Sequence, residues 1–247
     1  MNGENENEIK WSLFDVALGL VVAIVLESVA VAIWASVSGG KVAAPNTAYP
    51  FGEEVSGFFG FWVGLVGTVV LASRFRGTGS LVKDLGLRVK LIDVPLGLSI
   101  GVACQVVAGW LIYLPFYHLV PSLKQNLSTP AKQLTGSGHG VTFLALAILI
   151  CICAPFVEEL FFRGLLLSSL KTSLKRGFGQ KATKWLSISI SAVVFGLVHF
   201  ELLQLPGLII LGLVLGYMVT KTGRLATSMF THAGFNAVTV FWLWKYH

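Results

Sequence analysis

Three short segments of this chain place ionisable and amide side chains inside runs that are otherwise apolar. The ionisable and amide residues are Glu158, Glu159, Arg163, His199, His232 and Asn236. Ionised groups at membrane depth are costly unless they are paired or wetted, so they are candidates for function by default. A carboxylate, two imidazoles and an amide together can activate a water molecule and stabilise an oxyanion, which is the chemistry of hydrolysis.

The first segment contains one glutamate more than an ion pair needs. Glu159 and Arg163 are four residues apart, so on a helix they lie on one face and can pair. Glu158 is turned about 100° from Glu159 and stays outside that pair. Pro155 removes a backbone donor, so we expect a kink that leaves room for water near Glu158. The alternative is a buried ion-pair cluster that fixes helix packing.

The other two segments each carry a pair of side chains one helical turn apart. Phe195 and His199 share a face, and so do His232 and Asn236. Counted at 1.5 Å per residue from the basic end of each apolar run, the candidate residues lie about 12 to 22 Å into the membrane. We therefore expect Glu158 and these polar groups to meet near the middle of the membrane.

Two chemistries fit this set of residues. In the first, which we prefer, Glu158 is the general base for water and His199 orients the water or shares its proton. His232 and Asn236 then donate hydrogen bonds to the developing oxyanion, and no cofactor is needed. In the second, Glu158, His199 and His232 bind a divalent metal such as zinc, with one open position for water.

The elements that must position these residues are apolar helices. The chain has 247 residues, of which 55% are hydrophobic and only 12% are charged, and its mean hydropathy is +0.77. Soluble domains carry about 25% charged residues, so the composition predicts an all-α polytopic membrane protein with an intramembrane polar cavity. The net charge of +6 comes mainly from short loops, so no nucleic-acid partner is expected, and the lipid bilayer is the expected surroundings.

Seven runs are long or apolar enough to be membrane spans, and the fold class is therefore about seven, or eight, transmembrane helices. The runs are 11–37, 56–73, 92–120, 141–170, 185–200, 206–220 and 225–244. We divide the chain into N-terminal helices and loops, 1–140, and a catalytic core, 141–247. The loops 74–90, 171–184 and 221–224 are strongly basic. Basic loops face the cytoplasm, so we predict a cytoplasmic N-terminus and an external C-terminus.

The three polar segments together resemble a known family. EELFFR matches an EExxxR motif, FGLVH matches FxxxH, and HAGFN matches HxxxN, in the same order. The chain is thus similar, over roughly 141–244, to the CAAX proteases and bacteriocin-processing enzymes, also called Abi proteins or intramembrane glutamic proteases. The string LGLR at 85–88 is a minor further similarity.

The resemblance implies an intramembrane endopeptidase that acts on a peptide or protein at the membrane. It implies Glu158 as the catalytic glutamate, assisted by His199, with His232 and Asn236 as the oxyanion site. Glu159 and Arg163 look like the supporting pair. The expected location is the cell membrane of a prokaryote. The alternative function is a non-catalytic immunity or scaffold protein that uses the same polar cluster for packing or partner binding.

The remaining polar residues of the apolar runs are not assigned a catalytic role. Glu27 could pair with a neighbour or line a cavity, and His118 is expected at the membrane interface. The cysteines Cys104, Cys151 and Cys153 are an odd number within apolar runs, so they are expected to be buried and free of disulfide bonds.

Overall fold

A computed structural model describes residues 11–40, 42–44, 47–117, 120, 122–136 and 138–246, and His118 lies outside these residues. No strand occurs among them, which confirms the all-α class. The α-helices are α1 (Leu13–Val37), α2 (Phe51–Arg76), α3 (Leu81–Leu85), α4 (Asp93–Ala108), α5 (Leu114–Tyr117), α6 (Leu123–Thr135), α7 (Val141–Ile148), α8 (Ala154–Glu159), α9 (Leu167–Leu174), α10 (Gln180–Leu197), α11 (Leu205–Thr222) and α12 (Leu225–Tyr246). The π-helical segments Gly109–Tyr113, Leu149–Cys153 and Leu160–Leu166 join α4 to α5, α7 to α8 and α8 to α9. Cys104, Cys151 and Cys153 are free, as expected, and Cys104 is buried, but Cys151 and Cys153 are only half-buried, contrary to the prediction.

Within the described residues, five helical units are long and apolar enough to cross a membrane, so the chain is an integral membrane protein. They are Leu13–Val37, Phe51–Arg76, Asp93–Tyr113, Val141–Leu174 and Leu205–Thr222. The expected spans 185–200 and 225–244 are also long helices, α10 and α12, but neither is as apolar as these five. The reason is their polar content, because α10 begins with Gln180, Lys181 and Lys184, and α12 carries His232 and Asn236. The exact count of seven or eight crossings stays a prediction.

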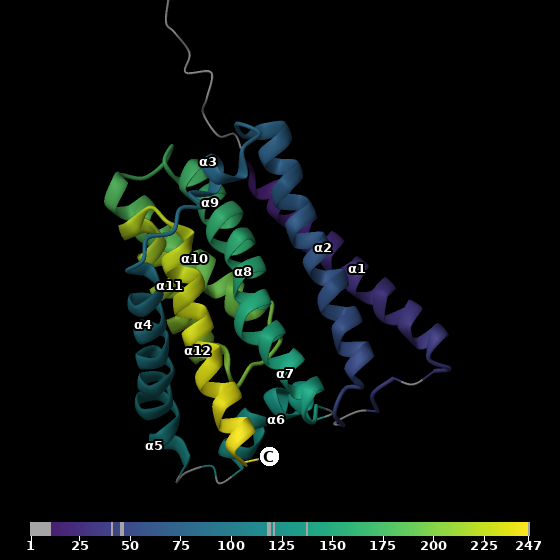
Figure 1. Ribbon diagram of the computed structural model, residues 1–247. Coiled ribbons are helices and arrows are strands. Elements are labelled where there is room, and N and C mark those ends of the chain that lie inside the picture. The colour runs from purple at the N-terminus through teal and green to yellow at the C-terminus, as the bar shows by residue number, and fades with distance from the viewer. Residues whose placement is uncertain are drawn as a thin grey trace, which may run out of the picture.

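Helices α1 and α2 form a hairpin whose backbones approach closely at small residues. A Cβ atom built on Gly60 would lie 2.4 Å from the carbonyl oxygen of Leu26, and one on Gly64 would lie 2.4 Å from the Cα atom of Ala23. Small residues allow this kind of packing between membrane helices, where the hydrophobic effect does not drive association. Figure 1 shows the hairpin inclined to the remaining helices and diverging from them toward the C-terminal end of α1.

Helices α4 and α12 run side by side in the same direction (Figure 1). A Cβ atom on Gly101 of α4 would lie 2.0 Å from the carbonyl oxygen of Thr231. At the N-terminal ends of the two helices, Arg224 donates hydrogen bonds of 2.9 and 2.5 Å to the fully buried Asp93, which also accepts one of 2.8 Å from the hydroxyl of Thr227. These contacts fix the height of α12, and therefore of His232, relative to α4.

The three basic connections predicted to share one side of the membrane lie at one end of the helices. Asp93 follows the first connection and Arg224 ends the third, and the two are paired. In Figure 1 this is the end at which α3 and α9 lie. The common end agrees with the basic-loop pattern. Its assignment to the cytoplasm stays a prediction, because the helices alone do not distinguish the two sides.

Candidate active site

The three polar segments meet where α8 lies against α12 and the end of α10. Glu158 is on α8, His199 directly follows Val198 at the end of α10, and His232 is on α12. Nε2 of His199 lies 4.0 Å, and Nε2 of His232 lies 3.9 Å, from the same Oε2 atom of Glu158. Helices that are far apart in the sequence thus bring two imidazoles to one carboxylate oxygen, as the common depth predicted.

That carboxylate oxygen is buried but has no hydrogen-bond partner in the described part of the chain. The Glu158 side chain as a whole keeps 16% of its surface exposed, and that of His199 keeps 30%. Separations of 3.9 and 4.0 Å exceed the roughly 3.2 Å limit of a direct hydrogen bond, but they suit a bridging water. The geometry therefore supports a water molecule held between carboxylate and imidazole.

Glu159 and Arg163 form the ion pair that their spacing predicts. Nη1 of Arg163 donates to Oε1 of Glu159 at 2.9 Å, and neither side chain has exposed surface. Nη2 of Arg163 also donates to the carbonyl of Gly212 on α11 at 3.4 Å. The pair joins the α8–α9 region to α11 and neutralises two charges that lipid would not tolerate separately.

Phe195 packs the supporting pair and both imidazoles into one cluster. The guanidinium carbon of Arg163 lies 4.2 Å from the centre of the Phe195 ring. The rings of His199 and His232 meet the same ring edge-on, with centroids 4.7 and 5.4 Å away. A fully buried aromatic side chain with so many neighbours has little freedom to move. Phe195 therefore holds both imidazoles in place around Glu158.

The backbone fixes the proton on one nitrogen of His199. Its Nδ1 atom lies 2.7 Å from the carbonyl oxygen of Phe195. A carbonyl only accepts hydrogen bonds, so Nδ1 is the donor. In the neutral imidazole, Nε2 then carries the lone pair and faces Glu158. His199 is followed by Phe200, which has a φ of 55°, a conformation that is uncommon for a bulky residue and is found at strained functional sites.

His232 lies between the two glutamates. Its Nδ1 atom is 3.4 Å from Oε1 of Glu159, while Nε2 faces Glu158 at 3.9 Å. The Nδ1 contact is within ion-pair distance, but its angle is too poor for a hydrogen bond. From the sequence, Glu159 was expected to contact Arg163 but not His232. The structure instead places His232 near both carboxylates, so Glu159 contacts Arg163 and also lies beside the imidazole.

Asn236 contacts the helix that carries Glu158 rather than Glu158 itself. Its amide nitrogen donates a hydrogen bond of 2.9 Å to the carbonyl of Ile150. In the π-helical segment Leu149–Cys153, the N–H of Ala154 bonds the carbonyl of Leu149. The next donor in that register would be Pro155, which has no N–H. Asn236 therefore satisfies the carbonyl that the proline leaves free, and one amide hydrogen remains for another acceptor.

The disturbance expected at Pro155 takes the form of π-helical segments on both sides of α8. Such segments widen a helix locally and occur frequently at functional sites. Leu160–Leu166, which follows Glu159 directly, carries Arg163 and is buried throughout. The widened helix thus directs Glu158, Glu159 and Arg163 toward one cluster from consecutive turns.

A metal ion fits this donor set less well than water does. In the described part of the chain, no group of three or more His, Cys, Asp and Glu side chains is arranged to hold a metal ion. Two ligands of a tetrahedral zinc are about 3.4 Å apart when each bond is about 2.0–2.1 Å, and the separations at Glu158 are 3.9 and 4.0 Å. A zinc bound by Glu158, His199 and His232 would require these side chains to move together.

Two cavities lie near the cluster, and they differ in what lines them. A cavity of about 250 Å³ reaches Glu158 and His199 from the side of α1 and α2, and it also includes Glu27. The sequence left Glu27 unassigned, and its position in the middle of an apolar run was the only signal. Burial raises the pKa of Glu201, which lies on the turn after His199.

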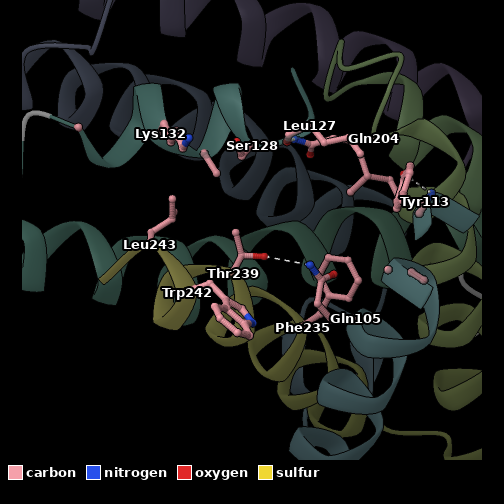
Figure 2. A pocket seen from close by; sticks show the side chains of 16 residues that line it. Gln105, Tyr113, Leu127, Ser128, Lys132, Gln204, Phe235, Thr239, Trp242 and Leu243 are labelled. Atoms are coloured by element: carbon pink, nitrogen blue, oxygen red, sulfur yellow. Dashed lines mark hydrogen bonds between the residues drawn. The ribbon is translucent and has the colours of Figure 1, made fainter. Parts of the chain in front are cut away.

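The second cavity is larger, about 990 Å³, and lies between α4, α6, α11 and α12. Figure 2 shows Lys132 and Ser128 of α6 on one side and Thr239 and Leu243 of α12 on the other. The amide of Gln105 donates a hydrogen bond of 3.1 Å to the hydroxyl of Thr239 along the wall that α4 and α12 form together. The candidate residues Glu158, His199, His232 and Asn236 are not among the residues that line it, although Phe235 of the HAGFN segment is.

A comparison with known families agrees with this arrangement. The profile of the family described as Type II CAAX prenyl endopeptidase Rce1-like matches residues 140–238. The matched segment holds all three motifs and confirms the resemblance to the CAAX protease and bacteriocin-processing family. Similarity to this family agrees with the expectation of a CAAX-protease-like intramembrane endopeptidase in general. Among curated proteins and among solved structures, none matches the chain significantly.

Proposed function

We propose that this protein hydrolyses a peptide bond of a membrane-proximal peptide or protein by means of a glutamate-activated water. One observation carries the proposal: the unpartnered Oε2 atom of Glu158 faces Nε2 of His199 and Nε2 of His232 at 4.0 and 3.9 Å. A general base must lie within hydrogen-bond reach of the proton it abstracts, directly or through one water. A water between Glu158 and His199 meets that requirement.

The first step is attack by this water on the carbonyl carbon of the scissile bond. The water oxygen forms the new C–O bond while one of its protons passes to Oε2 of Glu158. Because Nδ1 of His199 donates to Phe195, Nε2 can accept a hydrogen bond from the second water proton. The carbonyl oxygen of the substrate becomes an oxyanion.

The oxyanion is stabilised by donors on α12. Nε2 of His232 provides one N–H, and the amide hydrogen of Asn236 that is not bonded to Ile150 provides the other. The C–N bond then breaks, and the leaving nitrogen takes the proton that Glu158 holds. The products are a carboxylic acid and an amine, and Glu158 is again ionised.

His232 lies between the two carboxylates of the cluster, with Nδ1 3.4 Å from Oε1 of Glu159 and Nε2 3.9 Å from Oε2 of Glu158. The buried Glu159–Arg163 pair therefore helps to orient the imidazole ring. Arg163 and Glu159 thereby act through His232, as positioning residues.

The metal-dependent route is the alternative chemistry. Glu158, His199 and His232 would then be the ligands, and the metal would supply a bound water of lowered pKa. The 3.9 and 4.0 Å separations in the donor set favour the glutamate route.

A non-catalytic function is favoured by one specific observation. Asn236 uses an amide hydrogen to satisfy the Ile150 carbonyl, so part of the polar cluster serves packing. An immunity or scaffold protein would need the polar cluster only for such packing contacts or for partner binding. Such a protein would show changes of stability or partner binding, and no change of cleavage, when Glu158 is substituted.

The test is cleavage of a defined peptide mixture by the purified full-length protein in detergent. Peptides from a proteome digest are incubated with wild type and with Glu158→Gln, and new termini are counted by mass spectrometry. We expect wild type to generate new termini and the variant to lose about 10²- to 10⁴-fold in rate. Equal rates in the two proteins would reject the mechanism, and no cleavage by wild type would favour the non-catalytic function.

The protein is expected in the cell membrane of a prokaryote, with its N-terminus in the cytoplasm. The bias of basic residues toward one end of the helices supports this orientation.

A further inference from the structure

The cavity of about 250 Å³ beside Glu158 joins two parts of the chain. One wall comes from α1 and α2, with Glu27, Phe58 and Trp62, and the other contains Glu158 and His199. Pockets that hold whole small-molecule ligands have volumes of about 300–1,000 Å³. This cavity is smaller, so it suits one side chain of a longer substrate whose backbone runs past Glu158.

Glu27 is the unexplained residue of this cavity. It lies about 21 Å along α1 from Leu13, close to the middle of that apolar helix. Among the residues that the structure describes, no hydrogen bond or ion pair engages its carboxylate. Gly57 on α2 leaves space beside it, since a Cβ atom built there would lie 4.0 Å from Oε1 of Glu27. An unpaired carboxylate in the middle of a membrane helix indicates a functional partner.

The charges that face the cavity are predominantly negative. Its ionisable side chains are two carboxylates, Glu27 and Glu158, and the imidazole of His199, and among the described residues no Lys or Arg lines it. Arg163 is nearby but already paired with Glu159. A negative site with apolar walls attracts cations more strongly than an exposed site does.

The apolar walls suit the same kind of ligand. Phe58 and Trp62 are stacked, with centroids 5.2 Å apart and ring planes at 12°, and both line the cavity. Aromatic faces attract ammonium and guanidinium groups, and they pack against the methylene stem that carries such groups. Carboxylate and aromatic rings together match a Lys or Arg side chain.

We propose that this cavity is the subsite for a positively charged side chain of the substrate, and that Glu27 is the residue that selects it. The inference rests on the proposed function, because the side chain is placed there by a peptide bound at Glu158. Glu27 is a specificity-determining residue that takes no part in the chemistry. It lies outside residues 140–238, so the preference comes from the N-terminal helices and not from the matched segment.

Binding of small probes tests the subsite without requiring cleavage. n-Butylammonium, which reproduces the charged end of a Lys side chain, and its uncharged analogue butan-1-ol are titrated into the purified full-length protein in detergent, with binding followed by calorimetry. Wild type should bind the cation about 10- to 100-fold more tightly than the uncharged analogue, and Glu27→Gln should lose that preference. Equal binding of cation and uncharged analogue by wild type would overturn the proposal.

A matched control keeps the result specific to the site. Glu53→Gln removes a carboxylate from the same α1–α2 hairpin. The Glu53 side chain lies outside the cavity, where it accepts a hydrogen bond from the backbone N–H of Ala43. It should keep the preference for the cation. If Glu53→Gln loses the preference as fully as Glu27→Gln does, the effect is one of general charge and the subsite is rejected.

Cleavage of the peptide mixture provides the second measurement. Sites cut by wild type should be enriched in Lys or Arg at one fixed position near the cut. Glu27→Gln should keep cutting and lose that enrichment. Cleavage by wild type without any basic preference overturns the proposal. Selective cation binding that depends on Glu27, without cleavage of any peptide, supports the subsite and contradicts the protease function.

Discussion

The amide of Asn236 donates a hydrogen bond of 2.9 Å to the carbonyl of Ile150, two residues that are 86 positions apart in the chain. The bond attaches α12 to the π-helical segment that precedes Glu158. It exists because Pro155 cannot supply the N–H that Ile150 would otherwise receive. A residue expected at an oxyanion site is thus also a structural link between two of the motif segments.

The link predicts that the effects of Asn236 and Pro155 on stability are coupled. Asn236→Ala should lower the free energy of unfolding by about 1–3 kcal/mol, since the Ile150 carbonyl loses its donor where no water replaces it. Pro155→Ala restores a backbone N–H at that position, so the loss should be much smaller in its background. Thermal unfolding of the four proteins of this double-mutant cycle in one detergent measures the coupling.

The same cycle separates packing from chemistry. If Asn236 also donates to the oxyanion, cleavage should fall about 10²- to 10³-fold in both backgrounds. Equal losses of stability with and without Pro155 would contradict the link to Ile150. If the double variant recovers cleavage as well as stability relative to Asn236→Ala, then Asn236 serves packing alone.

The buried pair of Glu159 and Arg163 predicts a second coupling. Arg163→Met leaves the Glu159 carboxylate buried without its partner, and should cost about 3–5 kcal/mol of stability. Glu159→Gln should also be strongly destabilising, because it leaves the guanidinium without its anion. The double variant should lose much less than the sum, since it removes both charges. Additive losses in unfolding measurements would mean that the ion pair is unimportant.

Removal of metal ions distinguishes the two chemistries of the site. In the glutamate route, cleavage by the purified protein should continue after dialysis against EDTA and 1,10-phenanthroline. In the metal route, chelation should abolish cleavage and added zinc should restore it, because the bound water would lose its activation. Zinc content, measured by elemental analysis of the dialysed protein, shows whether chelation was complete. Chelator-sensitive cleavage that zinc restores would contradict our preferred mechanism.

The basic connections predict the orientation of the chain in the membrane. In a background in which Cys104, Cys151 and Cys153 are replaced by alanine, Ser80→Cys should be protected from a membrane-impermeant thiol reagent in intact cells. Ser38→Cys, at the opposite end of α1 and α2, should react. The reason is the retention of Lys- and Arg-rich loops in the cytoplasm. The reverse pattern of labelling would place the N-terminus outside.

Local chemistry in the sequence was sufficient to predict the long apolar helices and the pairing of Glu159 with Arg163, but not α3 and α6, which lie outside the predicted runs. Long apolar runs in lipid must be helical because no water is present to satisfy the backbone. Two opposite charges four residues apart on such a helix meet without help from the rest of the chain. The sequence also indicated that Glu158, His199 and His232 lie at similar depths, because depth along a helix follows from counting residues.

Rotation of the helices and contacts between distant segments were decided only by the tertiary structure. Counting residues gives a height along a helix but not the direction in which a side chain points. Packing at Phe195 sets that direction for both imidazoles, and the Asp93–Arg224 pair sets the height of α12. The donation from Asn236 to Ile150, and the position of Glu27 in the cavity beside Glu158, depend on helices that only the folded chain brings together.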